Sequence, residues 1–248
     1  MFVDTHSHLN FKAFNKDRDE VIKKSLDGGV WQINASSTFS TSLLAVDIAE
    51  KYSKGVYAAI GLHPIHIKDE DFDVEKYREL AKSKKVVAIG ETGLDYMYPE
   101  QEKQKEVFLE HLQLAKELDL PVIFHCRKAH DDMIKILDEG SPRIRGVVHC
   151  FTGKWSQAKK YLDMGLHLGF NGIIFKHDVD EAIKKAPLDR ILIETDCPYL
   201  TPPEAGTGRN EPLNIKYIAQ RIAELRGESL ETIIQATTQN AKQLFNLT

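Results

Sequence analysis

The residues best suited to chemistry are two histidines near the amino-terminus, His6 and His8. They are one residue apart and follow the apolar start Met1-Phe2-Val3. Side chains two positions apart on a β-strand point to the same face. If these residues end a short strand, both imidazoles can therefore bind one metal ion.

Four more potential metal ligands each follow a short apolar run. They are Glu91 after 86–89, His125 after 122–124, His149 after 147–148, and Asp196 after 191–195. Imidazole nitrogens and carboxylate oxygens are common ligands of divalent transition metals. Six such side chains at five predicted strand ends indicate a hydrolase that uses two metal ions.

The residue types suggest how two ions would be shared. A carboxylate has two oxygens, and Glu91 on a middle strand is the best candidate to bridge them. We assign His6, His8, Glu91 and Asp196 to the first ion, and Glu91, His125 and His149 to the second. Asp196 would also accept a proton as water attacks; a pure ligand role and a helix cap are the alternatives. The mixed ligand set suits Zn, Mn, Co or Ni.

Four further residues could contact a substrate. His63, in Gly61-Leu62-His63-Pro64, could contact a phosphate oxygen or protonate a leaving group, unless it only stabilises a turn. Arg127 could bind phosphate or form a surface ion pair. Arg209 could bind phosphate through both arms of its guanidinium, or serve only its loop. Tyr96, with Asp95 before it, could stack on a base or support a ligand.

These residues require a fold that brings strand ends together. Eight strand-like runs occupy residues 2–5, 30–34, 56–60, 86–90, 122–125, 146–149, 167–170 and 191–194. Helical patterns lie between them, most clearly at 101–119, and two helices at about 214–226 and 230–246 end the chain, divided at Gly227. The strands are apolar almost throughout, which is typical of a parallel sheet covered by helices.

This alternation predicts an α/β fold, a single (β/α)8 TIM barrel over residues 1–248 with an extra C-terminal helix. An open doubly wound sheet is the alternative, but its first strand should lead into a glycine-rich loop. The chain has Thr5-His6-Ser7-His8 there. In a barrel, the active site lies at the carboxyl ends of the strands, where all six candidate ligands fall.

The composition narrows the class of protein. The net charge of −4 argues against a protein that coats nucleic acid, but not against an enzyme that binds phosphate locally. The odd cysteine count (Cys126, Cys150 and Cys197) fits a reducing cytosol. No signal peptide or membrane span is recognisable. We therefore expect a cytoplasmic protein without a membrane partner, and a monomer.

The chain resembles the TatD-related metal-dependent deoxyribonucleases of the amidohydrolase superfamily along its full length. The resemblance rests on the stretches 2–9, 61–64, 90–96, 149–153, 194–202 and 209–212, and on Asn240-Ala241 with Leu244-Phe245. It implies a barrel with a binuclear site that cleaves DNA phosphodiester bonds, often from 3′ to 5′ and with a preference for single-stranded ends. The family's ligand positions fall on the six residues chosen above, and its phosphate-proximal histidine falls on His63. Mg is commonly used with this family and joins the candidate metals.

Two other functions stay open. The same barrel and site could hydrolyse a C–N or ester bond of a small molecule, such as an aminoacyl compound. A non-catalytic metal-binding or nucleic-acid-binding module is the third possibility. The candidate phosphate contacts His63, Arg127 and Arg209 favour the nuclease.

Overall fold

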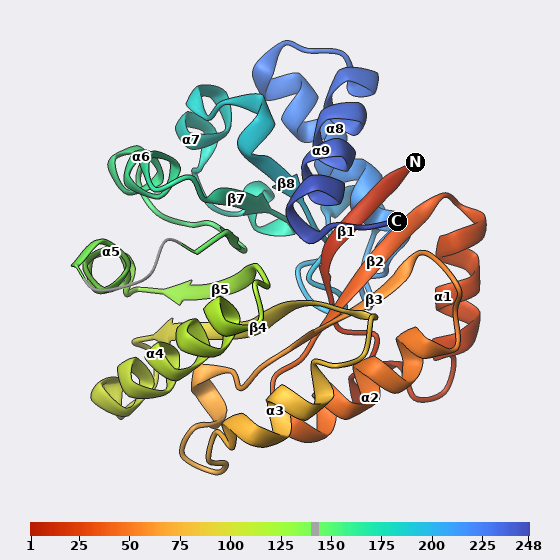
Figure 1. Cartoon of the computed structure of the whole chain (residues 1–248). Helices are drawn as coiled ribbons and strands as arrows, with labels where there is room; N and C mark the ends of the chain where they lie inside the picture. The colour runs from red at the N-terminus through yellow and green to blue at the C-terminus, as the bar shows by residue number, and fades with distance from the viewer. Residues whose placement is uncertain (140–143) are drawn as a thin grey trace.

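The computed structural model describes residues 1–139 and 144–248, which form a TIM barrel (Figure 1). Eight parallel strands neighbour one another in chain order: β1 (Phe2–Ser7), β2 (Val30–Ala35), β3 (Val56–Ile60), β4 (Val86–Asp95), β5 (Val122–Arg127), β6 (Gly146–Val148), β7 (His167–Phe170) and β8 (Ile191–Ile193). The predicted fold class is confirmed. The prediction of one domain over residues 1–248 stays a prediction, and residues 140–143 lie outside the described part.

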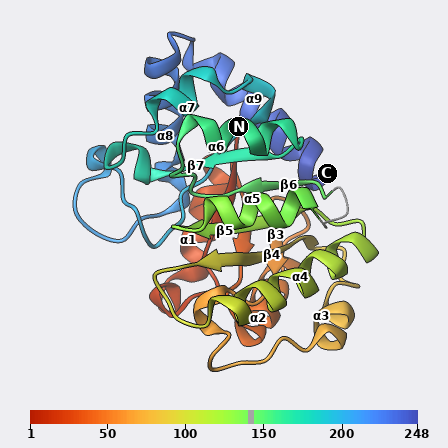
Figure 2. The same ribbon diagram turned by 90° about the vertical axis from the view of Figure 1, so that its left-hand side faces the viewer.

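Helices follow the strands and surround them on the outside (Figures 1 and 2). They are α1 (Arg18–Asp27), α2 (Phe39–Glu50), α3 (Val74–Leu80), α4 (Gln101–Glu117), α5 (His130–Glu139), α6 (Trp155–Asp163), α7 (Asp180–Lys185), α8 (Ile215–Arg226) and α9 (Leu230–Phe245). The extra C-terminal helix is α9. Helix α3 was not predicted from the sequence, because its seven residues contain few apolar side chains. None of the described helices has both the length and the apolar character needed to cross a membrane.

Strand β4 is longer than the predicted run 86–90. Its second half, Thr92 to Asp95, pairs with Phe124 to Arg127 of β5 after a register shift. The residues Thr92-Gly93-Leu94-Asp95 do not form the apolar run that is typical of a buried strand. They form a strand only because they pair with β5. Glu91 consequently lies inside β4 rather than in a loop after it.

Helix α9 covers the amino-terminal end of the barrel. Its Leu244 and Phe245 join a buried cluster with Val3, Ile33 and other side chains that fill the barrel. The Asn240 amide also donates to the carbonyl of Ile191 at the start of β8 (2.9 Å). Burial of each large apolar side chain contributes about 2 kcal/mol. This end of the barrel is therefore packed largely with apolar side chains.

Hydrogen bonds join β1 to the segment after β8 and so close the barrel. The amide of Thr195 donates to Oδ1 of Asp4 (2.8 Å), and the amide of Asp196 donates to the carbonyl of His6 (2.8 Å). The first and last strands of the barrel are thereby held together. The backbone positions of His6 and Asp196 become neighbours although 190 residues of sequence separate them.

A buried histidine on α4 supports the loop after β3. The ring of His111 packs on Phe72, its Nδ1 donates to the carbonyl of Val107 (2.7 Å), and its Nε2 accepts from the amide of Leu62 (3.0 Å). Both nitrogens are thus used by a neutral ring. Burial lowers the pKa of His111 from 6.5 to about 4.

We expect acid to destabilise the protein between pH 6.5 and pH 4. The unfolded chain binds a proton on His111 below pH 6.5, while the folded chain resists it until about pH 4, so the stability present at neutral pH is lost as the pH falls. The loss at pH 4.5 should be about 2 kcal/mol from this residue. Urea unfolding of metal-free protein at pH 7 and pH 4.5 measures it. His111→Gln, which can still accept from Leu62 but does not titrate, should show a smaller fall; an equal fall contradicts the assignment.

Candidate metal centre

All six predicted ligands lie together at the carboxyl end of the barrel. His6 belongs to β1, Glu91 to β4 and His125 to β5, whereas His8, His149 and Asp196 lie just beyond β1, β6 and β8. Parallel strands that end on one side of a barrel bring such positions to one place.

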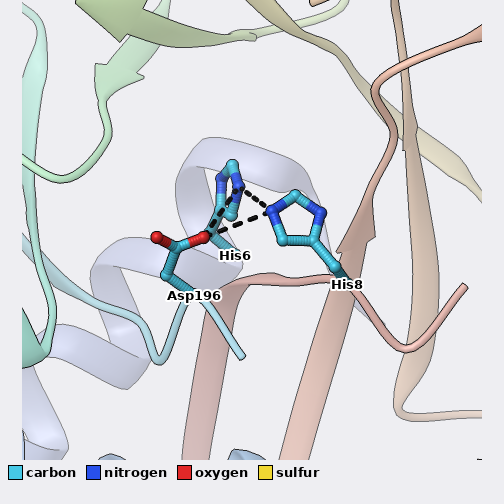
Figure 3. A group of neighbouring side chains, drawn as sticks. All are labelled: His6, His8 and Asp196. Carbon is cyan, nitrogen blue, oxygen red and sulfur yellow. Dashed lines mark hydrogen bonds and ion pairs between the residues drawn. The ribbon is translucent and has the colours of Figure 1, made fainter. Parts of the chain in front are cut away.

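The first group consists of His6, His8 and Asp196, drawn in Figure 3. The Nε2 atoms of the two histidines are 3.2 Å apart. Oδ1 of Asp196 lies 3.2 Å from Nε2 of His8 and 3.8 Å from Nε2 of His6. Three ligand atoms from β1 and the segment after β8 therefore point at one position.

The hydrogen bonding of His8 shows that this position suits a cation. Its Nδ1 must donate to the carbonyl of Ala35 (2.9 Å), so the lone pair of a neutral ring is on Nε2 and faces the Asp196 carboxylate. Two acceptors that face each other in a buried site need a positive charge between them. A proton can also meet this need: burial opposes the charged form, but the contact with Asp196 raises the pKa of His8. The residues present thus fit a divalent metal ion.

Glu91 divides its two oxygens between two groups of histidines. Oε2 lies 3.2 Å from Nε2 of His6 and 3.9 Å from Nε2 of His8. Oε1 lies 2.7 Å from Nδ1 of His125 and 2.8 Å from Nε2 of His149. Burial opposes the charged carboxylate, yet the surrounding histidines hold the pKa of Glu91 well below its usual range. This is the geometry that a bridging carboxylate requires.

The second group consists of Glu91, His125 and His149, and two acidic side chains orient its histidines. Nε2 of His125 pairs with Oδ2 of Asp95 (3.1 Å), and Nδ1 of His149 pairs with Oε1 of Glu194 (3.2 Å). A carboxylate on the outer nitrogen fixes a histidine ligand and raises its basicity. Burial opposes protonation, but the acidic partners raise the pKa of both rings. Glu194 was not among the predicted site residues, although it is a carboxylate directly after the apolar run 191–193.

His63 also faces Glu91, but as a hydrogen-bond donor. Its Nδ1 accepts from the amide of Ile65 (3.1 Å), so a neutral ring carries its proton on Nε2, 3.3 Å from Oε1 of Glu91. Burial lowers the pKa of His63 to about 4 and the neighbouring His125 adds to the effect. A neutral ring with this proton can donate to an anionic oxygen, and it has no lone pair on Nε2 for a metal.

Two of the predicted substrate contacts lie on the side of the site formed by β4 and β5. Arg127 is exposed at the end of β5, and its carbonyl accepts from the amide of Tyr96 (3.0 Å). The Tyr96 hydroxyl donates to Asp132 of α5. Burial, together with this acidic partner, raises the pKa of Tyr96 to about 12. Arg127 is thus exposed at the end of β5, while the Tyr96 hydroxyl is hydrogen-bonded to α5.

The structure gives Arg209 different partners from the predicted phosphate. Its guanidinium binds both oxygens of Asp17 (2.9 and 2.6 Å) and also contacts Glu211 (3.1 Å) and the carbonyl of Ala13 (2.7 Å). It lies over the ring of Phe14, 4.2 Å from the centroid. The bidentate geometry expected for phosphate is therefore used by a carboxylate. Arg209 ties the loop after β8 to the segment before α1.

One exposed aromatic residue near the site was not selected from the sequence. The side chain of Tyr199 is 54% exposed, and its ring centroid lies 6.2 Å from that of His8. Its backbone is held on both sides, because its amide donates to the carbonyl of Asp196 (2.9 Å) and its carbonyl accepts from the Asn210 amide (2.8 Å). An exposed ring on a hydrogen-bonded stretch of backbone thus lies beside His8.

This chain is similar to known proteins in both sequence and fold. Residues 3–246 match the family model described as TatD related DNase. The chain is 42% identical to the uncharacterized metal-dependent hydrolase YabD of Bacillus subtilis, over 100% of both chains. It is 36% identical to the 3'-5' ssDNA/RNA exonuclease TatD of Erwinia tasmaniensis, covering 98% of this chain and 99% of that one. The crystal structure of YJJV, a TatD homolog from Escherichia coli K12, has a TM-score of 0.91 at 32% identity, covering 100% and 98% of the two chains.

Proposed function

Since this chain belongs to the TatD-related DNase family and is a metal-dependent hydrolase, we propose that it removes nucleotides from the 3′ ends of single-stranded DNA with two divalent metal ions. The proposal rests on one observation: the two carboxylate oxygens of Glu91 face different histidines. Oε2 faces His6, and Oε1 faces His125 and His149. A carboxylate placed in this way supports two adjacent ions, which is the arrangement that phosphodiester hydrolysis uses.

The residues of the chain have distinct tasks in this reaction. His6, His8, Glu91 and Asp196 would hold one ion, and Glu91, His125 and His149 the other. Bound divalent cations lower the pKa of water and stabilise negative charge on the attacking and leaving oxygens. Asp196, whose side chain is 14% exposed at the rim of the site, accepts a proton from the attacking water. The neutral Nε2–H of His63 donates to a phosphate oxygen, and Arg127 supplies a positive charge at the rim.

We infer that stacking on Tyr199 underlies the proposed preference for single strands. Because the Arg209 guanidinium is bound to Asp17, it contributes little to phosphate binding, and substrate binding must rely on other groups. Aromatic rings bind unpaired bases with on the order of 1–3 kcal/mol each. A terminal base in a duplex already stacks on its neighbour and must be released first. Tyr199 therefore selects ends that are not paired.

We expect Tyr199→Ala to raise the KM for a single-stranded oligonucleotide on the order of 10-fold, with little change in kcat. Tyr199→Phe keeps the ring and should behave as the wild type. Steady-state kinetics on an oligonucleotide with a normal or an abasic 3′ terminal nucleotide provide the measurement. The alanine effect should vanish with the abasic end, and an effect of equal size there would rule out stacking.

The activity itself is tested with metal-stripped protein and a 5′-labelled single-stranded oligonucleotide. Mg, Mn, Co, Ni and Zn ions are restored one at a time. A ladder of products shortened from the 3′ end is the expected result, with a blunt duplex cut more slowly. If no metal restores cleavage while an aminoacyl ester is hydrolysed, the chain is a small-molecule hydrolase instead.

A further inference from the structure

Glu194 lies fully buried behind the candidate metal centre, directly after β8. Its Oε1 accepts three hydrogen bonds: from Nδ1 of His149 (3.2 Å), the amide of Cys150 (2.7 Å) and Nδ2 of Asn171 (3.0 Å). Its Oε2 has no hydrogen-bond partner among the described residues. A buried carboxylate oxygen is costly without a donor, so Oε2 requires one.

His6 offers the matching donor. Its ring is fully buried and stacks on His149 with 3.9 Å between centroids and 12° between planes. Nε2 of His6 faces the first group of ligands, and Nδ1 has no hydrogen-bond partner within the described part of the chain. Ligand atoms of His6, His149 and Glu194 all lie within 4.8 Å of one another. When Nε2 holds a cation, the neutral ring carries its proton on Nδ1, and this N–H requires an acceptor.

We propose that Glu194 positions one ligand of each metal ion at the same time, an inference that rests on the two-metal function proposed above. Oε1 fixes His149 of the second ion. Oε2 accepts the Nδ1 proton of His6 of the first ion through one bridging water molecule, because the structure has no direct hydrogen bond between these two atoms. Glu194 thus acts through two histidines and couples the two metal positions.

The neighbouring residue Gly169 supports this role for Oε2. A Cβ atom at position 169 would lie 2.6 Å from Oε2 of Glu194 and 3.1 Å from Cα of His149. Both neighbours are rigidly held, so any side chain here would push the carboxylate out of place. The glycine leaves the space that Oε2 occupies, behind both histidines.

Asp95 provides a matched control because it touches a single ligand. Its Oδ2 pairs with Nε2 of His125, and its Oδ1 accepts from the amide of Met97 (3.0 Å). Asp95→Asn should therefore disturb only the second metal ion. Glu194→Gln keeps an oxygen for the donors on Oε1 but places an NH2 group where Oε2 accepts. It should disturb both ions, by loss of charge beside His149 and by loss of the acceptor for His6.

The test is a Co²⁺ titration of metal-free protein, followed by calorimetry and visible absorption, which need no substrate. The wild type should bind two Co²⁺ ions. Glu194→Gln should weaken both binding steps by about 10-fold or more, and Asp95→Asn only one. Gly169→Ala displaces the same carboxylate and should also weaken both binding steps. If one of these two variants fails to fold, the other still tests the inference. Circular dichroism checks that each variant is folded.

The outcomes separate this inference from the proposed function. If the wild type binds two ions and Glu194→Gln weakens one step or none, the coupling by Glu194 is wrong while the two-metal function stands. If the wild type binds only one ion, the two-metal function is wrong, and the inference falls with it.

Discussion

Glu91→Gln should weaken metal binding at both positions and lower kcat/KM for single-stranded DNA on the order of 1000-fold or more. The amide has the same shape as the carboxylate, so packing is kept. However, one of its two oxygens becomes an NH2 group that cannot bind a cation, and the negative charge is lost. Because Oε1 faces His125 and His149 while Oε2 faces His6, either orientation of the amide leaves one pair of histidines without its bridging oxygen.

Metal content by mass spectrometry and the rate of 3′ shortening measure this prediction. Glu100→Gln is the matched control, because Glu100 is an exposed residue just before α4. It should leave both readouts unchanged. If Glu91→Gln retains two ions per chain and normal turnover, the bridging role is refuted.

Asp196→Asn is expected to lower kcat by about 100- to 1000-fold, with a smaller effect on KM. Burial raises the cost of charge on Asp196, but the contacts with His8 and His6 lower its pKa, so it is ionised at neutral pH. Asparagine keeps an oxygen toward His8 but cannot take a proton from water. The loss should therefore appear mainly in the chemical step.

Single-turnover kinetics separate this effect from substrate binding. Asp178→Asn changes an exposed carboxylate after β7 and serves as the control for the loss of one negative charge. Its rate should match that of the wild type. A kcat for Asp196→Asn within a few-fold of normal would leave Asp196 with no part in proton transfer.

Several features of the site could be predicted because they depend on local sequence alone. Strand alternation predicted that His6 and His8 would meet; the structure brings them together although His8 lies just beyond β1. Glu91, His125, His149 and Asp196 each follow an apolar run. Parallel strands in a barrel all end on the same side. Once the repeating strand and helix pattern was recognised, the meeting of these side chains followed from topology, without any knowledge of distances.

The remaining features depend on partners far away in the sequence. Arg209 and Asp17 are 192 residues apart, so no local sequence pattern could predict that the guanidinium binds this carboxylate. The second half of β4 exists only through its pairing with β5. Glu194 looked like the last residue of a strand, and its role depends on His149, Asn171 and His6 being brought to it.

The sequence by itself determined the barrel, the six candidate ligands and the end of the barrel at which they lie, because strand alternation and helical periodicity are local properties. Only the tertiary structure decided which nitrogen of each histidine faces inward, that Arg209 is bound to a carboxylate and which carboxylates support the ligands. Those outcomes depend on burial and hydrogen-bond partners, which arise when distant segments pack together.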